Sequence, residues 1–180
     1  MAASFFKIAS TTISSATSTV ELSSIPQTYN HLIVKISVRT TVSADNEYFN
    51  LRINNDSGLK YNKYTHYYNG GSSGMSSQAW VDQDYMYMYQ AVGDTSTANV
   101  FSNHELFFSN YTSTENKPVL EESNSLKDTI GASGSLRMVT SSSMLWRPTT
   151  NTGITTLTFT TASGNFKVNS SFTLYGVKNS

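Results

Sequence analysis

The stretch HLIVKISVR, residues 31–39, decides what kind of fold this chain adopts. Its apolar side chains recur on alternate positions, at Leu32, Val34, Ile36 and Val38. The side chains expected on the other face include His31, Lys35, Ser37 and Arg39. Successive side chains of a β-strand point to opposite faces, so this alternation predicts a strand with one buried and one solvated face. Half-buried strands of this kind are typical of antiparallel sheets.

The same two-residue period recurs along most of the chain. Further strands are predicted at residues 5–8, 20–22, 49–53, 64–68, 80–90, 100–108, 118–123, 136–139, 154–159 and 172–177. Helical periodicity is almost absent, and turn-forming residues separate many of these segments. The pattern predicts an all-β fold, an antiparallel jelly-roll-like β-sandwich of about ten strands.

The last predicted strand, within SSFTLYGVK at residues 170–178, could close one sheet of the sandwich. Phe172 and Leu174 fall on one face, which we expect to be buried. Gly176 is expected to allow a close backbone approach or a local bend. Tyr29 is expected to cap the edge of the sandwich, and Trp146 to anchor its core.

The composition of the chain is neutral, aromatic and poor in charge. Of the 180 residues, 13% are charged and 12% aromatic, the net charge is +0, and cysteine is absent. A neutral chain lacks the basic face of a nucleic-acid-binding protein, and without cysteine there is no disulfide or thiolate metal site. No stretch approaches the roughly 20 apolar residues of a membrane span, so we expect no membrane partner. We expect a single domain over residues 1–180, in which residues 1–18 could form an arm that contacts a neighbour.

Short sequence blocks along the chain occur in an order similar to that of a known family. They are SSIPQTYNHL at 23–32, SVR at 37–39, NYTS at 110–113, LWR at 145–147, ITTL at 154–157, SGNF at 163–166 and FTLYGV at 172–177. Their order resembles that of small structural proteins of tailed bacteriophages, including cyanobacterial phages. The resemblance implies a virion component, made in the host cytoplasm and displayed on the head or tail as a β-sandwich. It implies no catalytic residues.

The predicted function is that of a non-enzymatic virion structural protein. It would act as a capsid decoration or cement module, or as a small head or tail fibre component, by contacting other capsid or tail subunits. Uncovered sheets have edge strands that associate unless blunted, which favours a homo-oligomer, with a trimer preferred. The alternative is a lectin-like receptor-binding module of the tail that recognises host surface glycans. A third hypothesis, a polysaccharide-degrading enzyme, needs two opposed carboxylates.

Tyrosines form the main candidate interface. The candidates are Tyr85, Tyr87 and Tyr89 on one face of the predicted strand 80–90, together with Tyr64 and Tyr68. Tyrosine offers rigid amphipathic contact area, which suits either a protein interface or a platform for sugars. The competing interpretation is ordinary packing, in which the methionines at 86 and 88 face the core and a loop covers the tyrosines.

Other polar residues give weaker signals. The cluster from Asn54 to Gly58, which includes Asp56, resembles an oxygen-rich calcium loop but lacks its spaced carboxylates, so a hairpin turn is the preferred interpretation. Asp82 and Asp84 are expected on one solvated strand face. Glu121 and Glu122 should face opposite sides of a strand. No nucleophile, nucleotide or metal motif is present, and neither catalysis nor a cofactor is expected.

Overall fold

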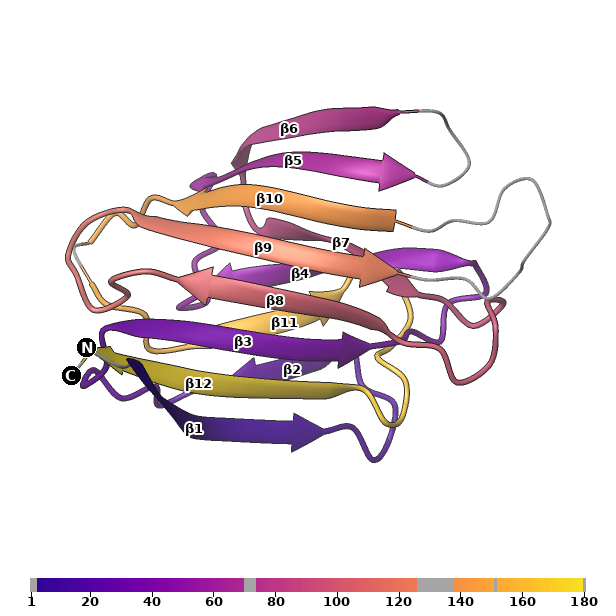
Figure 1. Ribbon diagram of the computed structural model, residues 1–180, viewed down its shortest axis with the longest axis horizontal. Coiled ribbons are helices and arrows are strands. Elements are labelled where there is room, and N and C mark those ends of the chain that lie inside the picture. Colours follow the sequence, from indigo (N-terminus) through magenta and orange to yellow (C-terminus); the bar gives the residue numbers. More distant parts are fainter. Residues whose placement is uncertain (1–2, 70–73, 126–137, 151, 180) are drawn as a thin grey trace.

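Twelve β-strands in two antiparallel sheets form the computed structural model, which describes residues 3–69, 74–125, 138–150 and 152–179 (Figure 1). These residues contain no helix. The predicted all-β sandwich is therefore confirmed. The molecule has two layers of unequal width, because one sheet has eight strands and the other has four.

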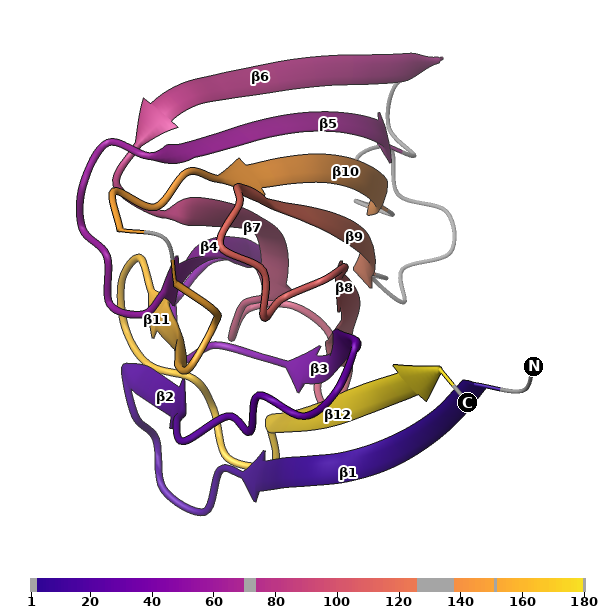
Figure 2. The same ribbon diagram turned by 90° about the vertical axis from the view of Figure 1, so that its left-hand side faces the viewer.

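The wide sheet is built from strands that are distant in sequence. Its spatial order is β1 (Ala3–Thr12), β12 (Ser171–Asn179), β3 (His31–Val38), β8 (Ser102–Phe108), β9 (Lys117–Ser125), β10 (Met138–Trp146), β5 (Tyr61–Asn69) and β6 (Met75–Gln83). The narrow sheet has the order β2 (Thr19–Leu22), β11 (Leu157–Thr161), β4 (Asn46–Ile53) and β7 (Met86–Val92). The narrow sheet lies behind the middle of the wide one, and β1 and β6 extend past it (Figures 1 and 2).

The core lies between the two sheets and follows the alternation of the sequence. In β3 the four apolar residues of the even positions are at most 3% exposed. Phe49 of β4 packs at 5.9 Å from Phe166, between ring centroids, and Phe172 of β12 lies 5.2 Å from the same ring. Phe172 and Leu174 are completely buried, as predicted, and each contributes roughly 1.5–3 kcal/mol to folding.

Two connections differ from the prediction. The single strand expected at 80–90 breaks at Asp84 and Tyr85, and its halves, β6 and β7, belong to different sheets. The turn that begins at Asn54 is not a hairpin, because it leads from β4 of the narrow sheet to β5 of the wide sheet. Local sequence specifies a change of direction in both places, but it does not specify to which sheet the next strand belongs. Of the strand expected at 136–139, residues 136 and 137 lie outside the described part, and β10 continues to Trp146.

Arg39 also differs from the prediction, since its side chain is buried rather than solvated. Its guanidinium donates hydrogen bonds to the carbonyl oxygens of Ser96 at 2.8 Å and Val100 at 2.9 Å. Backbone carbonyls satisfy the charged group, so its burial does not leave donors unpaired. Arg39, at the end of the predicted strand 31–39, therefore holds the loop between β7 and β8 in place.

Gly176 permits a close approach, as the sequence predicted. A Cβ atom at this position would lie 2.4 Å from ring atoms of Tyr29. The ring of Tyr29 therefore packs directly on the backbone of β12, 5.7 Å from the ring of Phe6 in β1. Tyr29 covers the junction between the last strand and the edge strand.

We predict that Gly176→Ala destabilises the protein by about 1–3 kcal/mol, because the added methyl group displaces the ring of Tyr29. Urea unfolding followed by circular dichroism measures the change. Gly58→Ala is the matched control, since its Cβ would approach no atom closer than 3.0 Å, and its nearest neighbours are side-chain atoms of Lys60 and Asp56. Equal free energies of unfolding for the wild type and Gly176→Ala would show that the contact between Tyr29 and Gly176 does not contribute to stability.

Candidate binding site on the wide sheet

The tyrosines of β7 are packed largely within the chain. Tyr89 is 5% exposed, and its ring lies 5.3 Å from Tyr67 and 5.4 Å from Tyr48. Trp80 of β6 lies 5.5 Å from the ring of Tyr87. Strands β5 and β6 thus cover the tyrosine face of β7, where the packing interpretation had expected a loop. Whether these rings also serve an interface stays a prediction.

The half-buried Tyr85 and Tyr87 hydrogen-bond to each other. Their hydroxyl oxygens are 2.9 Å apart, and the ring of Tyr85 also lies beneath the guanidinium of Arg52. Burial, followed by the hydrogen bond to Tyr87, raises the pKa of Tyr85 to about 12. Tyr85 therefore remains neutral at physiological pH and can donate its hydroxyl proton to Tyr87.

Tyr64 and Tyr68 occupy a different surface from Tyr85, Tyr87 and Tyr89. They lie on β5 and point to the outer face of the wide sheet, where their exposed fractions are 47% and 46%. Their sequence spacing placed them on one face, but it gave no register against the neighbouring strands. The structure therefore separates the five candidate tyrosines into a packed group and an outer group.

The weak metal candidates are already used as hydrogen-bond partners. The carbonyl oxygen of the Asn54 side chain accepts bonds from the amides of Thr155 at 2.8 Å and Thr156 at 3.0 Å. The carboxylate of Asp56 accepts from the Gly58 amide and from the indole of Trp146, each at 3.0 Å. These bonds join loops to each other and to the core. Among the described residues, no three His, Asp or Glu side chains form a group that could hold a metal ion.

Asp82 and Asp84 do not form a shared acidic site. Asp84 is bound to Arg52, with the two charged atoms 2.6 Å apart, whereas Asp82 is bound to Arg147. Asp82 has a positive φ of 53°, at an irregularity in the pairing of β5 with β6. The two carboxylates therefore have separate cationic partners.

The strongest ionic cluster lies inside the sandwich. The Lys63 ammonium donates to one oxygen of Glu121 at 2.6 Å and to the backbone carbonyl of Tyr87 at 2.7 Å. Nδ1 of His104 lies 3.1 Å from the other oxygen of Glu121. Burial favours the protonated acid, but Lys63 and His104 outweigh that effect and lower the pKa of Glu121 to about 2.

This cluster is closed to substrates. The side chains of Glu121 and His104 have no exposed surface, and that of Lys63 is 2% exposed. Its ionic groups bind each other and the backbone, although Nε2 of His104 has no hydrogen-bond partner among the described residues. We therefore interpret the cluster as structural: it pairs the ionic and polar side chains that β5, β8 and β9 carry into the interior.

A hollow of about 710 Å³ crosses the outer face of the wide sheet, from β12 to β6. The sheet bends away from the narrow sheet toward both of its edges, so this outer face is concave (Figure 2). The volume of the hollow is within the range found for ligand sites in proteins. We call this hollow the trough.

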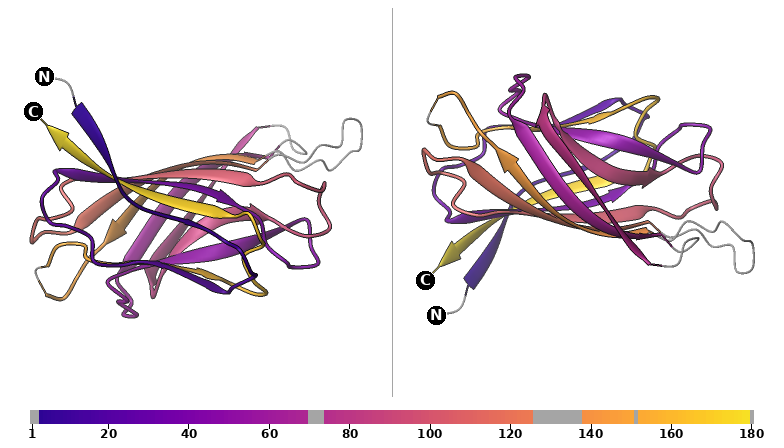
Figure 3. Two further views of the ribbon diagram at one scale, coloured as in Figure 1. Left: turned by 90° about the horizontal axis from the view of Figure 1, so that it is seen from below. Right: turned by 90° about the horizontal axis from the view of Figure 1, so that it is seen from above.

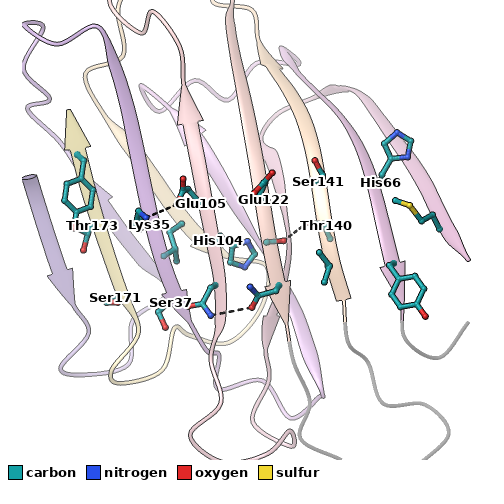
Figure 4. Close-up of a pocket in the computed structure, with 18 residues that line it drawn as sticks. Lys35, Ser37, His66, His104, Glu105, Glu122, Thr140, Ser141, Ser171 and Thr173 are labelled. Atoms are coloured by element: carbon teal, nitrogen blue, oxygen red, sulfur yellow. Dashed lines mark hydrogen bonds and ion pairs between the residues drawn. The ribbon is translucent and has the colours of Figure 1, made fainter. Parts of the chain in front are cut away.

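Two rows of side chains run along the trough, at right angles to the strands. Antiparallel register aligns the charged row, which contains Thr173, Lys35, Glu105, Glu122, Ser141 and His66. Figure 4 shows these six residues following one another across the sheet. Lys35 pairs with Glu105 at 3.0 Å, whereas Glu122 has no ion pair or hydrogen bond within the described residues.

The second row is mainly neutral. Register aligns Ser171, Ser37, Asn103, Asn124, Val139, Tyr68 and Met75 in this amide row. The side-chain amides of Asn103 and Asn124 face each other at 3.5 Å. Tyr68 lies toward one end of the trough and Tyr175 toward the other. The trough thus offers hydroxyl and amide groups between two aromatic rings.

Most of the trough was missed by the sequence analysis, with the exception of Tyr68. The alternation within β8 and β9 does place Asn103, Glu105, Glu122 and Asn124 on solvated faces. What brings them together is the pairing of β8 with β9, and that register is absent from the local pattern of either strand. A search for rows of polar residues would therefore need the strand order first.

Glu105 and Glu122 are directly opposite each other on β8 and β9. Two carboxylates across a sugar-sized groove would suit a glycosidase only if an apolar environment kept one of them protonated. Both side chains are instead exposed, and Glu105 is bound to Lys35. This arrangement suits acceptance of hydrogen bonds better than proton transfer.

We predict that Glu121→Gln destabilises the protein by about 3–5 kcal/mol at pH 7, because it leaves the Lys63 ammonium buried without a carboxylate. The folded pKa of Glu121 is below its unfolded value, so its contribution exists above pH ~4.3 and disappears as the pH falls toward 2. The destabilisation relative to wild type should therefore shrink between pH 5 and pH 2, as judged by urea unfolding across that range.

Glu122→Gln is the matched control, because Glu122 is the next residue on the same strand and faces solvent. It should change stability by less than about 0.5 kcal/mol at any of these pH values. If Glu121→Gln behaved like Glu122→Gln, the buried pair would have no part in stability.

Comparison with known proteins places the chain in no family. No protein-family model, curated protein or solved structure matches it. In the described part of the chain there is also no helix with the length and hydrophobicity needed to span a membrane. A function must therefore be inferred from the surfaces described above.

Proposed function

We propose that this chain is a non-enzymatic structural protein of a tailed-phage virion. It attaches to other capsid or tail subunits as a decoration or cement module, or as a small head or tail fibre component. The resemblance of its sequence blocks supports the virion context, and the jelly-roll-like connectivity belongs to the same proposal. One structural observation carries the attachment role: both edge strands of the wide sheet are long, have no neighbour on their outer side among the described strands, and expose large apolar side chains.

Strand β6 forms the first open edge. Seven of its nine residues are exposed, and it has no neighbour beyond β5 among the described strands. From Met75 to Val81 it contains no charged residue and no proline. Proteins that remain monomeric commonly block such edges with charges, prolines or bulges. Met75 and Val81, at 71% and 60% exposure, instead present apolar surface.

Strand β1 forms the second open edge. It pairs with β12 on one side, from Ala3↔Asn179 to Thr12↔Ser171, and has no neighbour among the described strands on the other. Phe5 is 62% exposed and Phe6 is 45% exposed. The two strands project together from the sandwich at the chain ends (Figure 3). Residues 3–12 of the expected arm are therefore an edge strand, and its contact with a neighbour is part of the proposal.

These two edges suit self-association as well as attachment. If β1 of one copy paired with β6 of the next, the wide sheets would become continuous and each edge would be covered. Such a head-to-tail contact closes into a ring when the rotation between copies permits it. A homo-trimer would be the simplest ring of this kind.

We predict that the double variant Phe5→Lys with Val81→Lys disrupts assembly, because a charge on each edge opposes strand pairing. Light scattering coupled to size exclusion should show a smaller species than wild type. Co-sedimentation with virions lacking the protein should fall at least tenfold, which corresponds to about 1.4 kcal/mol of binding free energy.

Leu59→Lys is the control. Leu59 is also highly exposed, at 68%, but it lies in the loop that connects β4 to β5 and not on an edge strand. It should assemble as wild type does. A double variant that assembles and co-sediments normally would contradict attachment through the sheet edges.

A further inference from the structure

We propose that the trough is a carbohydrate-binding site that accepts an extended, uncharged oligosaccharide. This goes beyond the attachment role, because it assigns a ligand to a surface that the open edges do not include. The site lies on the outer face of the wide sheet, between Tyr68 on β5 and Tyr175 on β12.

The shape of the trough suits a chain rather than a compact molecule. It crosses seven strands, from β12 to β6, so that six spacings of about 4.8 Å give a length of roughly 29 Å. Its two rows are two residues apart along each strand, a separation of roughly 6.6 Å. A linear chain of sugar rings fits a channel that is long and narrow.

The chemistry of the trough suits hydroxyl groups. The face of a paired sheet presents no free backbone donors or acceptors, so a ligand there must be recognised by side chains. Asn103 and Asn124 supply both amide donors and carbonyl acceptors, and Glu122 supplies acceptors that bind no other described group. Sugar hydroxyls both donate and accept, so they match this mixed set.

The tyrosines supply the apolar part of sugar recognition. A tyrosine ring offers a rigid apolar face with a polar hydroxyl at its edge. Tyr68 and Tyr175 lie on strands at opposite sides of the trough, so one chain could contact both rings. The separation of Tyr68 from Tyr175 across the trough favours several linked sugars over a single sugar ring.

The charges of the trough favour an uncharged ligand. Lys35 and Glu105 neutralise each other, which leaves Glu122 as the carboxylate of the trough without an ion-pair partner among the described residues. A carboxylated or sulfated glycan, or a nucleic acid, would meet this carboxylate without a free cation to compensate. The site should therefore discriminate against anionic chains.

The test uses the full chain with neutral hexasaccharides of glucose in α and β linkage and of mannose. An anionic heparin hexasaccharide serves as the comparison ligand. Isothermal titration should detect binding of at least one neutral hexasaccharide and weaker binding of heparin. Tyr68→Ala should then reduce the affinity about tenfold, because it removes one aromatic face from the trough.

Tyr64→Ala is the matched control. Tyr64 lies on the same strand and the same face as Tyr68, with nearly equal exposure, but outside the trough. It should leave the affinity within about twofold, a change smaller than 0.5 kcal/mol. A second variant, Asn124→Ala, tests the amide row without touching an aromatic residue, and should weaken binding while circular dichroism remains unchanged.

Three results would overturn the site: no binding of any neutral hexasaccharide, stronger binding of heparin, or equal losses in Tyr68→Ala and Tyr64→Ala. Assembly is tested separately, because the edge variant Phe5→Lys with Val81→Lys should keep its affinity for sugar. Release of new reducing ends would show that the protein hydrolyses the bound sugar. That result would contradict the non-enzymatic role but would still support the binding site.

Discussion

The register between antiparallel strands is the constraint on which the rest of this structure depends. Side chains alternate between faces, so a slip of one residue would exchange the core face and the solvent face of a strand. In β8 and β9 such a slip would expose Leu106 and bury Glu105. The same pairing that places Phe108 in the core aligns Asn103 with Asn124 on the opposite side. Core and trough are therefore two results of one alignment.

The buried ionic cluster explains why the wide sheet is not uniformly apolar inside. Lys63, His104 and Glu121 come from three different strands, β5, β8 and β9, and their contacts with one another form only when all three strands are in place. An apolar substitution of the whole group could be equally stable, so its contribution is better understood as alignment of those strands than as net stabilisation. Tyr67, Trp80 and Tyr89 pack against one another beside them.

Alternation within single strands was enough to predict the class of fold and much of the core. Phe49, Leu51 and Ile53 are fully buried because the face they share was visible in their spacing. The sequence pattern did not show which strands pair with each other or in which register. The split at Asp84, the burial of Arg39 and the rows that form the trough all depend on pairings between distant segments, for which a local pattern carries no information. Glu121 and Glu122 do face opposite sides, but the partners of Glu121 came only from the structure.

The position of β3 in the wide sheet has a consequence for how the chain acquires its shape during synthesis. This strand is made early, at residues 31–38, yet its two neighbours are β8 and β12, and β12 contains the end of the described chain. One side of β3 can pair once β8 emerges, but its other side stays unpaired until residues 171–177 emerge. Pairings this distant close late and slowly, and the waiting segment is open to wrong partners. Chaperone demand should thus be greatest in the interval before β12 emerges.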